Sequence, residues 1–467
     1  MILISDFSIK FPLEKERMFL YDREKRILSD KICRMSDAKQ TNCFDNPVEE
    51  GIYMIIFHID ANSAYLSWEA AYRIQNGASV DLREIPSVVG GNEKQRHGIV
   101  LAKSIPSKKY GIQTGESLYS ARQKCPDLVV VPPNYDLYIK CSDAMYQILC
   151  EYSPIVQRFS VDECFLDYTD SEKRFGDPVQ AAFTIKERIK KELGFTVNIG
   201  VSTNKILAKM ASEFKKPDKL HTLFPDEMKD KLWHLPVEDL FMVGRATTQK
   251  LKKININTIG ELAHANPHYL KTMLKSHGLL VWQYANGLDD SKVKISGEIL
   301  QKGLGNSTTT AFDVTTKKEA LMVLLSLTER TAMRLRSLGY LCSLISVSLR
   351  SSHFEWYSHQ KKLRTYTNST SEIFSYITDL FEEVWKGEPL RNLGVRFSDF
   401  STDEYAQLSF FDSKEKLKNQ KLDGAIDKIR LKYGDGAIVR SVFLHSGINP
   451  IQGGVNDGEY PMMTSIL

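Results

Sequence analysis

An apolar run that ends in a carboxylate constrains the fold of this chain more than any other feature. Residues 54–59 read Met-Ile-Ile-Phe-His-Ile, and Asp60 follows directly. A short and almost uniformly apolar run is typical of a strand that is buried on both faces of a sheet. We therefore expect a central strand whose last residue places an acid at the edge of a sheet.

Helix and strand patterns alternate after Asp60, which is expected of a sheet backed by helices. The predicted helices are 64–73, 117–123, 137–152, 178–193 and 204–214, and the predicted strands are 88–89, 99–102, 128–131, 155–161, 164–168 and 196–201. Residues 225–288 change to short helices and tight turns, and residues 301–397 return to strands and helices. The pattern predicts an α+β chain of several domains.

The composition says more about the cellular compartment of the protein than about its binding partner. The chain has 62 Lys and Arg against 58 Asp and Glu, and a net charge of +4 neither requires nor excludes a polyanion. Its seven cysteines are scattered, with no C-x-x-C pair, which indicates free thiols and argues against a structural zinc site. No apolar run approaches the roughly 18 residues of a membrane span, and the start of the chain lacks a secretion signal. We expect a cytoplasmic monomer without a membrane partner.

Three acids are candidate metal ligands. Asp60 ends the first strand, and Asp162 and Glu163 lie between two later strands. Carboxylates at the ends of neighbouring strands can meet in space, and oxygen ligands of this kind suit Mg²⁺. Two such ions can activate an attacking hydroxyl and stabilise a leaving pyrophosphate. The alternative interpretation is that Asp162-Glu163 marks a solvated hairpin turn.

The segments around these acids resemble one enzyme family. Residues 159–167, Phe-Ser-Val-Asp-Glu-Cys-Phe-Leu-Asp, resemble the S-[IV]-D-E-x-[FY]-L-D signature of Y-family, translesion DNA polymerases of the bacterial DinB/UmuC-like kind, and residues 57–65 resemble the opening motif of that family. The resemblance extends from Met54 to about Phe411. It implies a multidomain right-hand polymerase with a ferredoxin-like palm sheet, small fingers, a helical thumb with a helix-hairpin-helix, and an α/β little finger.

The resemblance also implies domain limits. They are a palm at 54–63 and 137–224, fingers at 64–136, a thumb at 225–291, a little finger at 298–400 and a tail at 401–467. Residues 1–53 are then an extension outside the main fold, and we hypothesise that they reflect an upstream start codon. N-terminal sequencing of native protein tests this, because a mature chain that begins at Met1 would count against it.

Active-site roles follow from the same resemblance. Asp60, Asp162 and Glu163 would be the catalytic ligands of two Mg²⁺ ions, and Ala61 would add its backbone carbonyl. Tyr65 would be the steric gate, a flat ring under the sugar that leaves no room for a ribose 2′-hydroxyl. The alternative for Tyr65 is an aromatic side chain that packs a helix on the sheet.

Two lysines are candidate triphosphate ligands. Lys209 matches the phosphate-binding lysine of the family motif N-K-x-x-A-K, and Lys205 lies on the same helix face, where it could instead pair with Glu213. In the fingers, Ile105 and Lys108 occupy the positions at which most of the family has the Tyr and Arg of S-Y-E-A-R-x-x-G. Lys108 either takes over the role of the Arg, as in the UmuC-like branch, or belongs to a solvated basic turn.

Three further regions are candidates for holding DNA. Residues 240–262 resemble a helix-hairpin-helix, whose backbone N–H groups bind phosphate without reading bases, unless they form only a small helical packing unit. Residues 302–309 resemble the opening of the little finger. The candidate DNA-binding residues of these two segments are Gly244, Arg245, Lys250 and Lys302. A third group, on a predicted helix, forms either phosphate contacts or a solvated face: Arg330, Arg334 and Arg336.

An apolar island in the polar tail is a candidate partner-binding peptide. Residues 407–411 resemble the bacterial sliding-clamp-binding peptide Q-L-[SD]-L-F, with Gln407, Leu408, Phe410 and Phe411 as its anchors. The alternative is a strand that packs back on the little finger. Residues 422–433 have a helical pattern to which we assign no role.

The function that these features predict is a template-directed, low-fidelity DNA polymerase for lesion bypass, with a place in DNA repair and SOS mutagenesis. Its partners would be primer-template DNA, deoxynucleoside triphosphates (dNTPs) and a sliding clamp. A palm-fold nucleotidyl cyclase is an alternative, but it leaves the hairpin motif and the clamp-like peptide unexplained. A non-catalytic clamp-tethered DNA-binding protein is another, but it would not need the three acids.

Overall fold

The computed structural model describes residues 54–295, 301–402, 414–448 and 450. The expected extension 1–53 and the clamp-like peptide 407–411 therefore lie outside the described residues. Within the described ranges, no helix is both long enough and apolar enough to cross a membrane.

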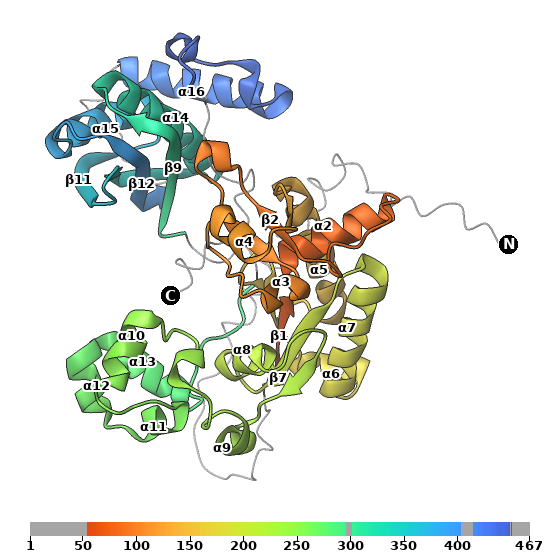
Figure 1. Ribbon diagram of the computed structural model, residues 1–467. Helices are drawn as coiled ribbons and strands as arrows, with labels where there is room; N and C mark the ends of the chain where they lie inside the picture. Colours follow the sequence, from red (N-terminus) through yellow and green to blue (C-terminus); the bar gives the residue numbers. More distant parts are fainter. Residues whose placement is uncertain (1–53, 296–300, 403–413, 449, 451–467) are drawn as a thin grey trace, which may run out of the picture. The chain divides into compact units, whose positions relative to one another are not determined.

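The apolar run that opens the sequence motifs forms the central strand of the palm (Figure 1). This strand, β1 (Ile56–Ala61), is buried along its whole length, which explains its composition. It lies in a five-stranded sheet of order β5-β6-β1-β7-β8, antiparallel to both of its neighbours. The other strands are β5 (Val156–Arg158), β6 (Glu163–Asp167), β7 (Val197–Ser202) and β8 (Leu220–Thr222).

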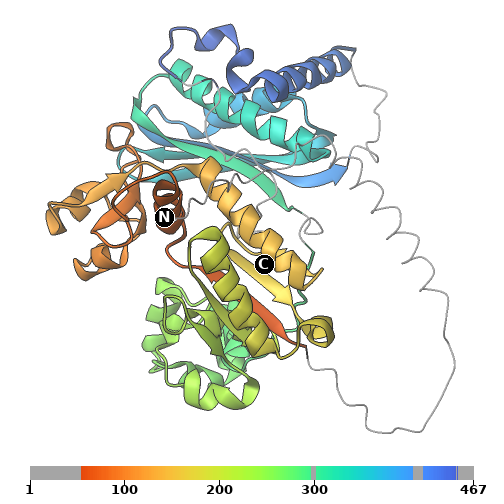
Figure 2. The ribbon, with the colours of Figure 1, turned by 90° about the vertical axis from the view of Figure 1, so that its right-hand side faces the viewer.

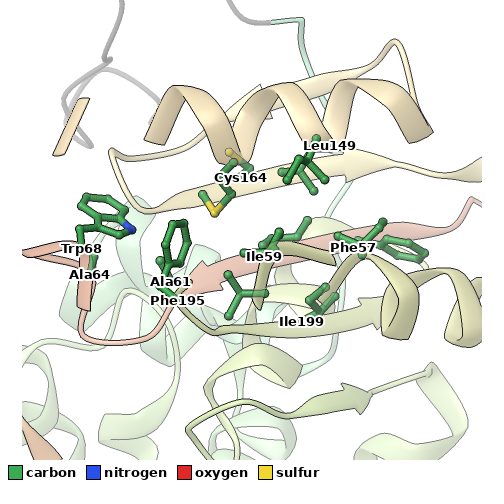
Figure 3. Packing of buried hydrophobic residues seen from close by; sticks show 14 of the residues in the cluster. Phe57, Ile59, Ala61, Ala64, Trp68, Leu149, Cys164, Phe195 and Ile199 are labelled. Carbon is green, nitrogen blue, oxygen red and sulfur yellow. The ribbon is translucent and has the colours of Figure 1, made fainter. Parts of the chain in front are cut away.

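Strand alternation divides the residues of β1 between two faces of this sheet. Phe57, Ile59 and Ala61 join the main core, which lies under two long helices (Figure 3). His58 points to the other face, where its ring contacts Ser212. Asp60 lies on the same face as His58, away from the apolar core. The helices that cover the sheet are α5 (Tyr135–Tyr152) and α7 (Pro178–Leu193) on the core face and α8 (Lys205–Glu213) on the face of Asp60, and a short helix α6 (Glu172–Phe175) precedes α7.

Two local features fix α8 against the sheet. The Asn204 side chain caps its first turn by accepting a 2.9 Å hydrogen bond from the Leu207 N–H. Gly200 on β7 allows a close approach, because a Cβ at that position would lie 2.0 Å from the Ala208 carbonyl oxygen. The helix therefore lies close to the strand, and its side chains reach the acids at the end of β1.

The fingers have their own small core. A three-stranded sheet of order β3-β2-β4 packs on two short helices around Val88, Val100, Ile112 and Leu118. The elements are β2 (Ser87–Gly90), β3 (Val100–Lys103), α3 (Ile105–Lys109), α4 (Leu118–Lys124) and β4 (Val129–Val131). The helix before them, α2 (Ala64–Gln75), instead buries Trp68 in the palm core.

The thumb consists of short helices, as its sequence predicts. Leu232, Leu251 and Leu262 share one core with Leu207 and Met210 of α8, so the thumb packs on the palm through this helix. The helices are α9 (Met228–Lys231), α10 (Arg245–Lys252), α11 (Ile259–His264), α12 (Pro267–Leu274) and α13 (Ser276–Ala285).

The little finger is a four-stranded antiparallel sheet with helices on one face (Figure 2). The strand order is β11-β10-β12-β9, and the core lies between the sheet and the helices α14 and α15. The elements are β9 (Gly303–Val314), α14 (Lys317–Ser337), β10 (Tyr340–Ser351), β11 (Trp356–Thr367), α15 (Thr370–Val384) and β12 (Leu390–Thr402).

The helical pattern in the tail corresponds to α16 (Lys414–Tyr433), which is attached to the little finger by ion pairs. Arg336 on α14 forms a two-pronged pair with Asp427 at 2.6 and 2.9 Å. Arg330 bonds the Asp435 carboxylate at 2.6 Å. Burial of Arg334, together with the charge of Arg330, lowers its pKa. For Arg330 and Arg336 both expectations, phosphate contacts or a solvated face, are wrong, because the C-terminal segment binds these two side chains.

Candidate active site

Strand register brings two of the three predicted acids together. Asp60 on β1 is the cross-strand partner of Glu163 on β6, and both point to the α8 side. One carboxylate oxygen of each, and one of Glu213, the last residue of α8, lie within 4.8 Å of one another. Glu163 therefore reaches the site by strand alternation and not through a relaxed turn.

Asp162 belongs to the turn before β6. Its carbonyl accepts a 3.0 Å hydrogen bond from the Ala61 N–H, which ties this turn to the end of β1. Its carboxylate accepts a 2.5 Å hydrogen bond from the Ser160 hydroxyl. The turn is thus not merely a solvated hairpin, because it is bonded to the strand that carries Asp60.

Two lysines neutralise part of this negative charge. Lys216 Nζ lies 3.1 Å from Asp60 Oδ2 and 2.9 Å from Glu213 Oε2. Lys209 Nζ lies 2.8 Å from Glu163 Oε2. Each lysine therefore holds a different carboxylate of the cluster.

The pKa values of the acids diverge because their surroundings differ. Burial raises the pKa of Asp60 to about 7, although the charge of Lys216 opposes the shift. Burial also raises the pKa of Asp162. For Glu163, burial acts in the same direction, but the neighbouring His58 and Lys209 outweigh it and hold its pKa below the usual range. Near neutral pH, Glu163 is therefore ionised, while Asp60 is close to its titration midpoint.

His58 is a buried neighbour of this cluster. Its Nδ1 lies 2.7 Å from Ser212 Oγ, and its Nε2 lies 3.4 Å from Glu163 Oε2. Burial lowers the pKa of His58 to about 4, and the charge of Lys209 acts in the same direction. The ring is therefore neutral at physiological pH and acts as a polar support beneath Glu163.

A cavity of about 540 Å³ opens beside the acids. Asp60 and Asp162 line one side of it, Tyr65 lines another, and Lys108 and Lys216 also border it. The residues that were predicted from separate motifs for metal, sugar and phosphate thus border one space.

The Tyr65 ring is held by other aromatic rings. It stacks on the buried Tyr138 ring, with centroids 4.5 Å apart and planes 10° apart, and the Tyr135 ring approaches edge-on at 6.2 Å. Tyr65 therefore packs on another helix, α5, and not on the sheet as the alternative interpretation expected, and it also borders the cavity.

The predicted triphosphate lysine Lys209 is not among the residues that line this cavity. It is 7% exposed, and its Nζ lies 5.2 and 5.3 Å from the ring centroids of Phe159 and Phe241. Lys205 is also buried, and it bonds Gln157 Oε1 at 3.2 Å and not Glu213. Helix spacing placed these two lysines on one helix face, but it did not reveal that both side chains are buried.

Glu213 and Lys216 are site residues that sequence reasoning missed as ligands. Glu213 lies four residues after Lys209, and this spacing on one helix face is a signal that could have identified it. Lys216 follows the end of α8 in an irregular segment, so no periodicity points to it. Its position became visible only through its contacts with Asp60 and Glu213.

The donor atoms fit a hard divalent cation. Asp60, Asp162 and Glu163 offer only carboxylate oxygens, the ligand type that Mg²⁺ prefers. Asp60 and Glu163 already converge on one another across the strand pair. Ala61 lines the same cavity, next to Asp60.

The thumb presents the predicted turn at the start of a helix. Gly244 is the N-cap residue of α10, and nothing lies within 4 Å of the position that its Cβ would occupy. Arg245 and Lys250 of the same helix are exposed. This helix start is accessible to a phosphate, in line with the backbone contact expected of Gly244.

The second face of the little-finger sheet, here named the open face, carries mostly glycine and polar side chains. Strand register places them in three rows across β11, β10, β12 and β9: Gln360, Ser346, Arg396 and Gly305; Ser358, Ser348, Gly394 and Ser307; and Trp356, Arg350, Asn392 and Thr309. These rows contain two arginines and no acid. Lys302, which directly precedes β9, is also exposed.

Comparison with known proteins identifies the family. The model described as the impB/mucB/samB family matches residues 59–213, and the model for the C-terminal domain of that family matches residues 301–410. DNA polymerase IV of Clostridium acetobutylicum is 50% identical over 391 residues, which cover 84% of this chain and 98% of that protein. DNA polymerase IV of Acetivibrio thermocellus is 38% identical over 402 residues, or 85% and 99% of the two chains.

A solved structure supports the fold. A Y-family DNA polymerase chimera aligns with a TM-score of 0.64 at 20% identity, over 75% of this chain and 100% of its own. The names of the sequence relatives favour DNA polymerase IV, although Lys108 pointed to the UmuC-like branch. The chain belongs to the impB/mucB/samB family and is a Y-family DNA polymerase.

Proposed function

We propose that this chain extends a DNA primer along a template with low fidelity and bypasses lesions, using the cavity between Asp60, Asp162 and Tyr65 for the incoming nucleotide. One observation carries the proposal: the cross-strand pair of Asp60 and Glu163 lies beside a cavity that Tyr65 also lines. Family membership favours this activity over a nucleotidyl cyclase and over a non-catalytic DNA-binding protein.

Asp60, Asp162 and Glu163 would hold two Mg²⁺ ions, with the Ala61 carbonyl as a further ligand. Ions held there would activate the primer 3′-hydroxyl for attack on the α-phosphate and stabilise the leaving pyrophosphate. The ionised state of Glu163, maintained by His58 and Lys209, keeps one ligand ready across the neutral pH range.

Lys108 and Lys216 are our candidates for steadying the triphosphate. Both border the cavity, and an ammonium group suits phosphate oxygens as a point charge. We assign Lys209 a positioning role instead, because its Nζ is occupied by Glu163. Lys216 would exchange its contact with Asp60 for the phosphates once an ion takes its place.

The thumb and the open face are our candidates for holding the duplex. Gly244, Arg245 and Lys250 would contact phosphates without reading bases. On the open face, small side chains would allow the backbone of a duplex to approach, and Arg396 and Lys302 would provide positive charge.

The clamp-like peptide remains a proposal from its sequence. We propose that Gln407, Leu408, Phe410 and Phe411 dock into a sliding clamp, and that the protein acts as a cytoplasmic monomer in SOS mutagenesis. A double variant, Gln407→Ala with Phe410→Ala, should lose clamp pull-down and keep primer extension on short templates. Undiminished pull-down would reject the assignment.

Primer extension with Mg²⁺ on damaged and undamaged templates tests the proposed activity. Asp162→Ala should abolish extension on both templates, because it removes a metal ligand beside the cavity. Asp127→Ala is a matched control, since this exposed carboxylate lies in the fingers away from the cavity lining. Absence of extension by the wild-type protein would instead favour a DNA-binding role.

A further inference from the structure

The turn between β10 and β11 exposes two large aromatic side chains. Phe354 is 54% exposed and Trp356 is 59% exposed. Phe354 also has a left-handed backbone with φ of 69°, and its N–H donates a 3.0 Å hydrogen bond to the Ser351 carbonyl. A bulky residue rarely adopts this conformation, and such strain is concentrated at functional positions. The turn therefore holds Phe354 in a strained conformation and leaves both rings exposed.

Two arginines accompany these rings. The Arg350 guanidinium lies 4.8 Å from the Phe354 ring centroid and 5.2 Å from the Trp356 centroid, and Arg391 lies 5.2 Å from the Phe354 centroid. Among the residues that the structure describes, neither arginine forms an ion pair. The adjacent Glu355 carboxylate accepts a 2.7 Å hydrogen bond from the Tyr357 hydroxyl. We name Arg350, Phe354, Trp356 and Arg391 the hairpin-tip cluster.

The cluster continues the open face of the sheet. Register pairs Trp356 with Arg350, and the next pair along the strands is Ser358 with Ser348. The alternate residues of β11 point to the helix face, where His359 lies 3.3 Å from Glu383 and Lys361 lies over the Tyr376 ring. Trp356 is therefore on the side proposed to hold DNA, at the end of the rows of small polar residues.

We propose that the hairpin-tip cluster binds an unpaired nucleotide of the template strand, with the base on the Trp356 ring and the phosphates near Arg350 and Arg391. Aromatic rings accept any base by stacking, and arginines beside them attract the backbone, so the site would not read sequence. Inside a duplex, stacked neighbours cover both faces of every base, so only the terminal pairs could meet the ring. This proposal rests on the proposed function, because it assumes that the open face holds template DNA.

Binding to matched DNA substrates tests the proposal. The probes are a labelled blunt duplex and the same duplex with a 5′ template overhang, measured by fluorescence anisotropy with the full chain at one salt concentration. The wild type should bind the overhang substrate more tightly than the blunt one. Trp356→Ala should weaken binding of the overhang substrate alone, by about tenfold. This is the effect expected from loss of one stacked base.

Three further variants complete the test. Trp356→Phe should retain most of the overhang preference, because it keeps an aromatic face. Tyr366→Ala removes another aromatic side chain of β11, which is 41% exposed, and should change the affinity for neither substrate. Arg350→Gln should reduce the salt dependence of overhang binding by about one unit of log-log slope. The thermal midpoint of each variant verifies that it folds.

Several outcomes would overturn the proposal. Equal weakening of blunt and overhang binding by Trp356→Ala would show a duplex contact, and unchanged binding of both would show no DNA contact. If neither substrate is affected by Trp356→Ala and the hairpin-tip cluster instead binds a protein, the cluster would be a protein-binding surface and the proposal would be wrong. Primer extension by the wild type, with Asp162→Ala inactive, is measured in parallel. If the wild type does not extend the primer, the proposed polymerase chemistry is rejected. The DNA-binding result does not depend on that outcome.

Discussion

Tyr65 combines an observed packing contact with the sugar selectivity that we propose for it. Its ring lies on the Tyr138 ring on one side and borders the cavity on another. A ring that is held on one face cannot yield easily to a bulkier sugar, so a 2′-hydroxyl would meet a fixed wall. The aromatic support from α5 was not predicted, because residues 73 positions apart in sequence, such as Tyr65 and Tyr138, give no local sign of stacking.

Tyr65→Ala should raise ribonucleotide incorporation relative to deoxyribonucleotide incorporation on the order of 10- to 200-fold, the range expected for loss of a contact worth ~1–3 kcal/mol. The measurement is the ratio of kcat/KM for the two sugars opposite the same template base. Tyr65→Phe keeps the ring and should retain the discrimination. Unchanged sugar selectivity in Tyr65→Ala would contradict the gate.

If Asp60 is a metal ligand, as we propose, the binding of the ion should depend on pH. Its pKa of about 7 in the folded chain is above its ordinary value of 3.8, mainly because of burial. For the metal-free protein, the contribution of Asp60 to stability is fully present below the ordinary value and is lost as pH rises through about 7. The same carboxyl must lose its proton to bind an ion, so ion binding strengthens over this window.

We expect the rise in Tm caused by Mg²⁺ to be larger at pH 8 than at pH 6. In Asp60→Asn, which has no titrating group at this position, the rise should be smaller and nearly independent of pH. Differential scanning fluorimetry at both pH values, with and without Mg²⁺, measures the effect. An equal rise at both pH values in the wild type would mean that Asp60 is already ionised at pH 6.

At the scale of elements, the sequence predicted those helices and strands that are encoded by local residue patterns. The helix 178–193 coincides with α7, because Asp177 caps it and an apolar stripe runs along it. The central strand was evident from its apolar run. The attachment of α16 was not, since it depends on ion pairs such as Arg336 with Asp427, 91 residues apart, that no periodicity reveals. The same limit hid the contacts of Lys216 with Asp60 and Glu213.

The pair of Arg336 and Asp427 should contribute more to stability than a typical surface pair. The two side chains are 13% and 20% exposed, and Arg336→Gln would leave Asp427 without its partner. We expect a loss of about 3 kcal/mol in the stability of the little finger, as for other poorly exposed pairs that lose one member. Urea unfolding and hydrogen exchange of α16 measure this loss.

Lys317→Gln is the matched control for Arg336→Gln. Lys317 pairs with Glu382 on the same domain, but the two side chains are 52% and 50% exposed. Its loss should cost less than about 1 kcal/mol. Equal effects of the two variants would mean that α16 adds little to the stability of the little finger.

At the scale of the whole molecule, the net charge of +4 concealed an uneven distribution. The rows of the open face carry arginines and no acid, whereas carboxylates gather at the palm site. The opposite signs nearly cancel in the total. Charge summed over the chain was therefore a poor guide to nucleic-acid binding, and its placement on surfaces is the informative quantity.

Arg396→Gln should weaken duplex binding about equally for different sequences and lower the log-log salt slope by about one. Lys428→Gln removes an exposed cation from α16 on the helix side of the little finger and should leave the slope unchanged. Filter binding over a series of salt concentrations measures both. A slope that Arg396→Gln does not alter would exclude a phosphate contact at this position.

The lysines at the palm site supply internal counter-ions. Lys209 and Lys216 already neutralise part of the charge of Asp60, Glu163 and Glu213, so the acids need no metal to coexist in the folded chain. We expect a chelator to leave the fold intact, unlike that of a zinc finger, whose folding depends on its ion. An ion held by Asp60 would take the place of the Lys216 ammonium, and the Lys216 side chain would then be next to the space where we propose that a triphosphate lies.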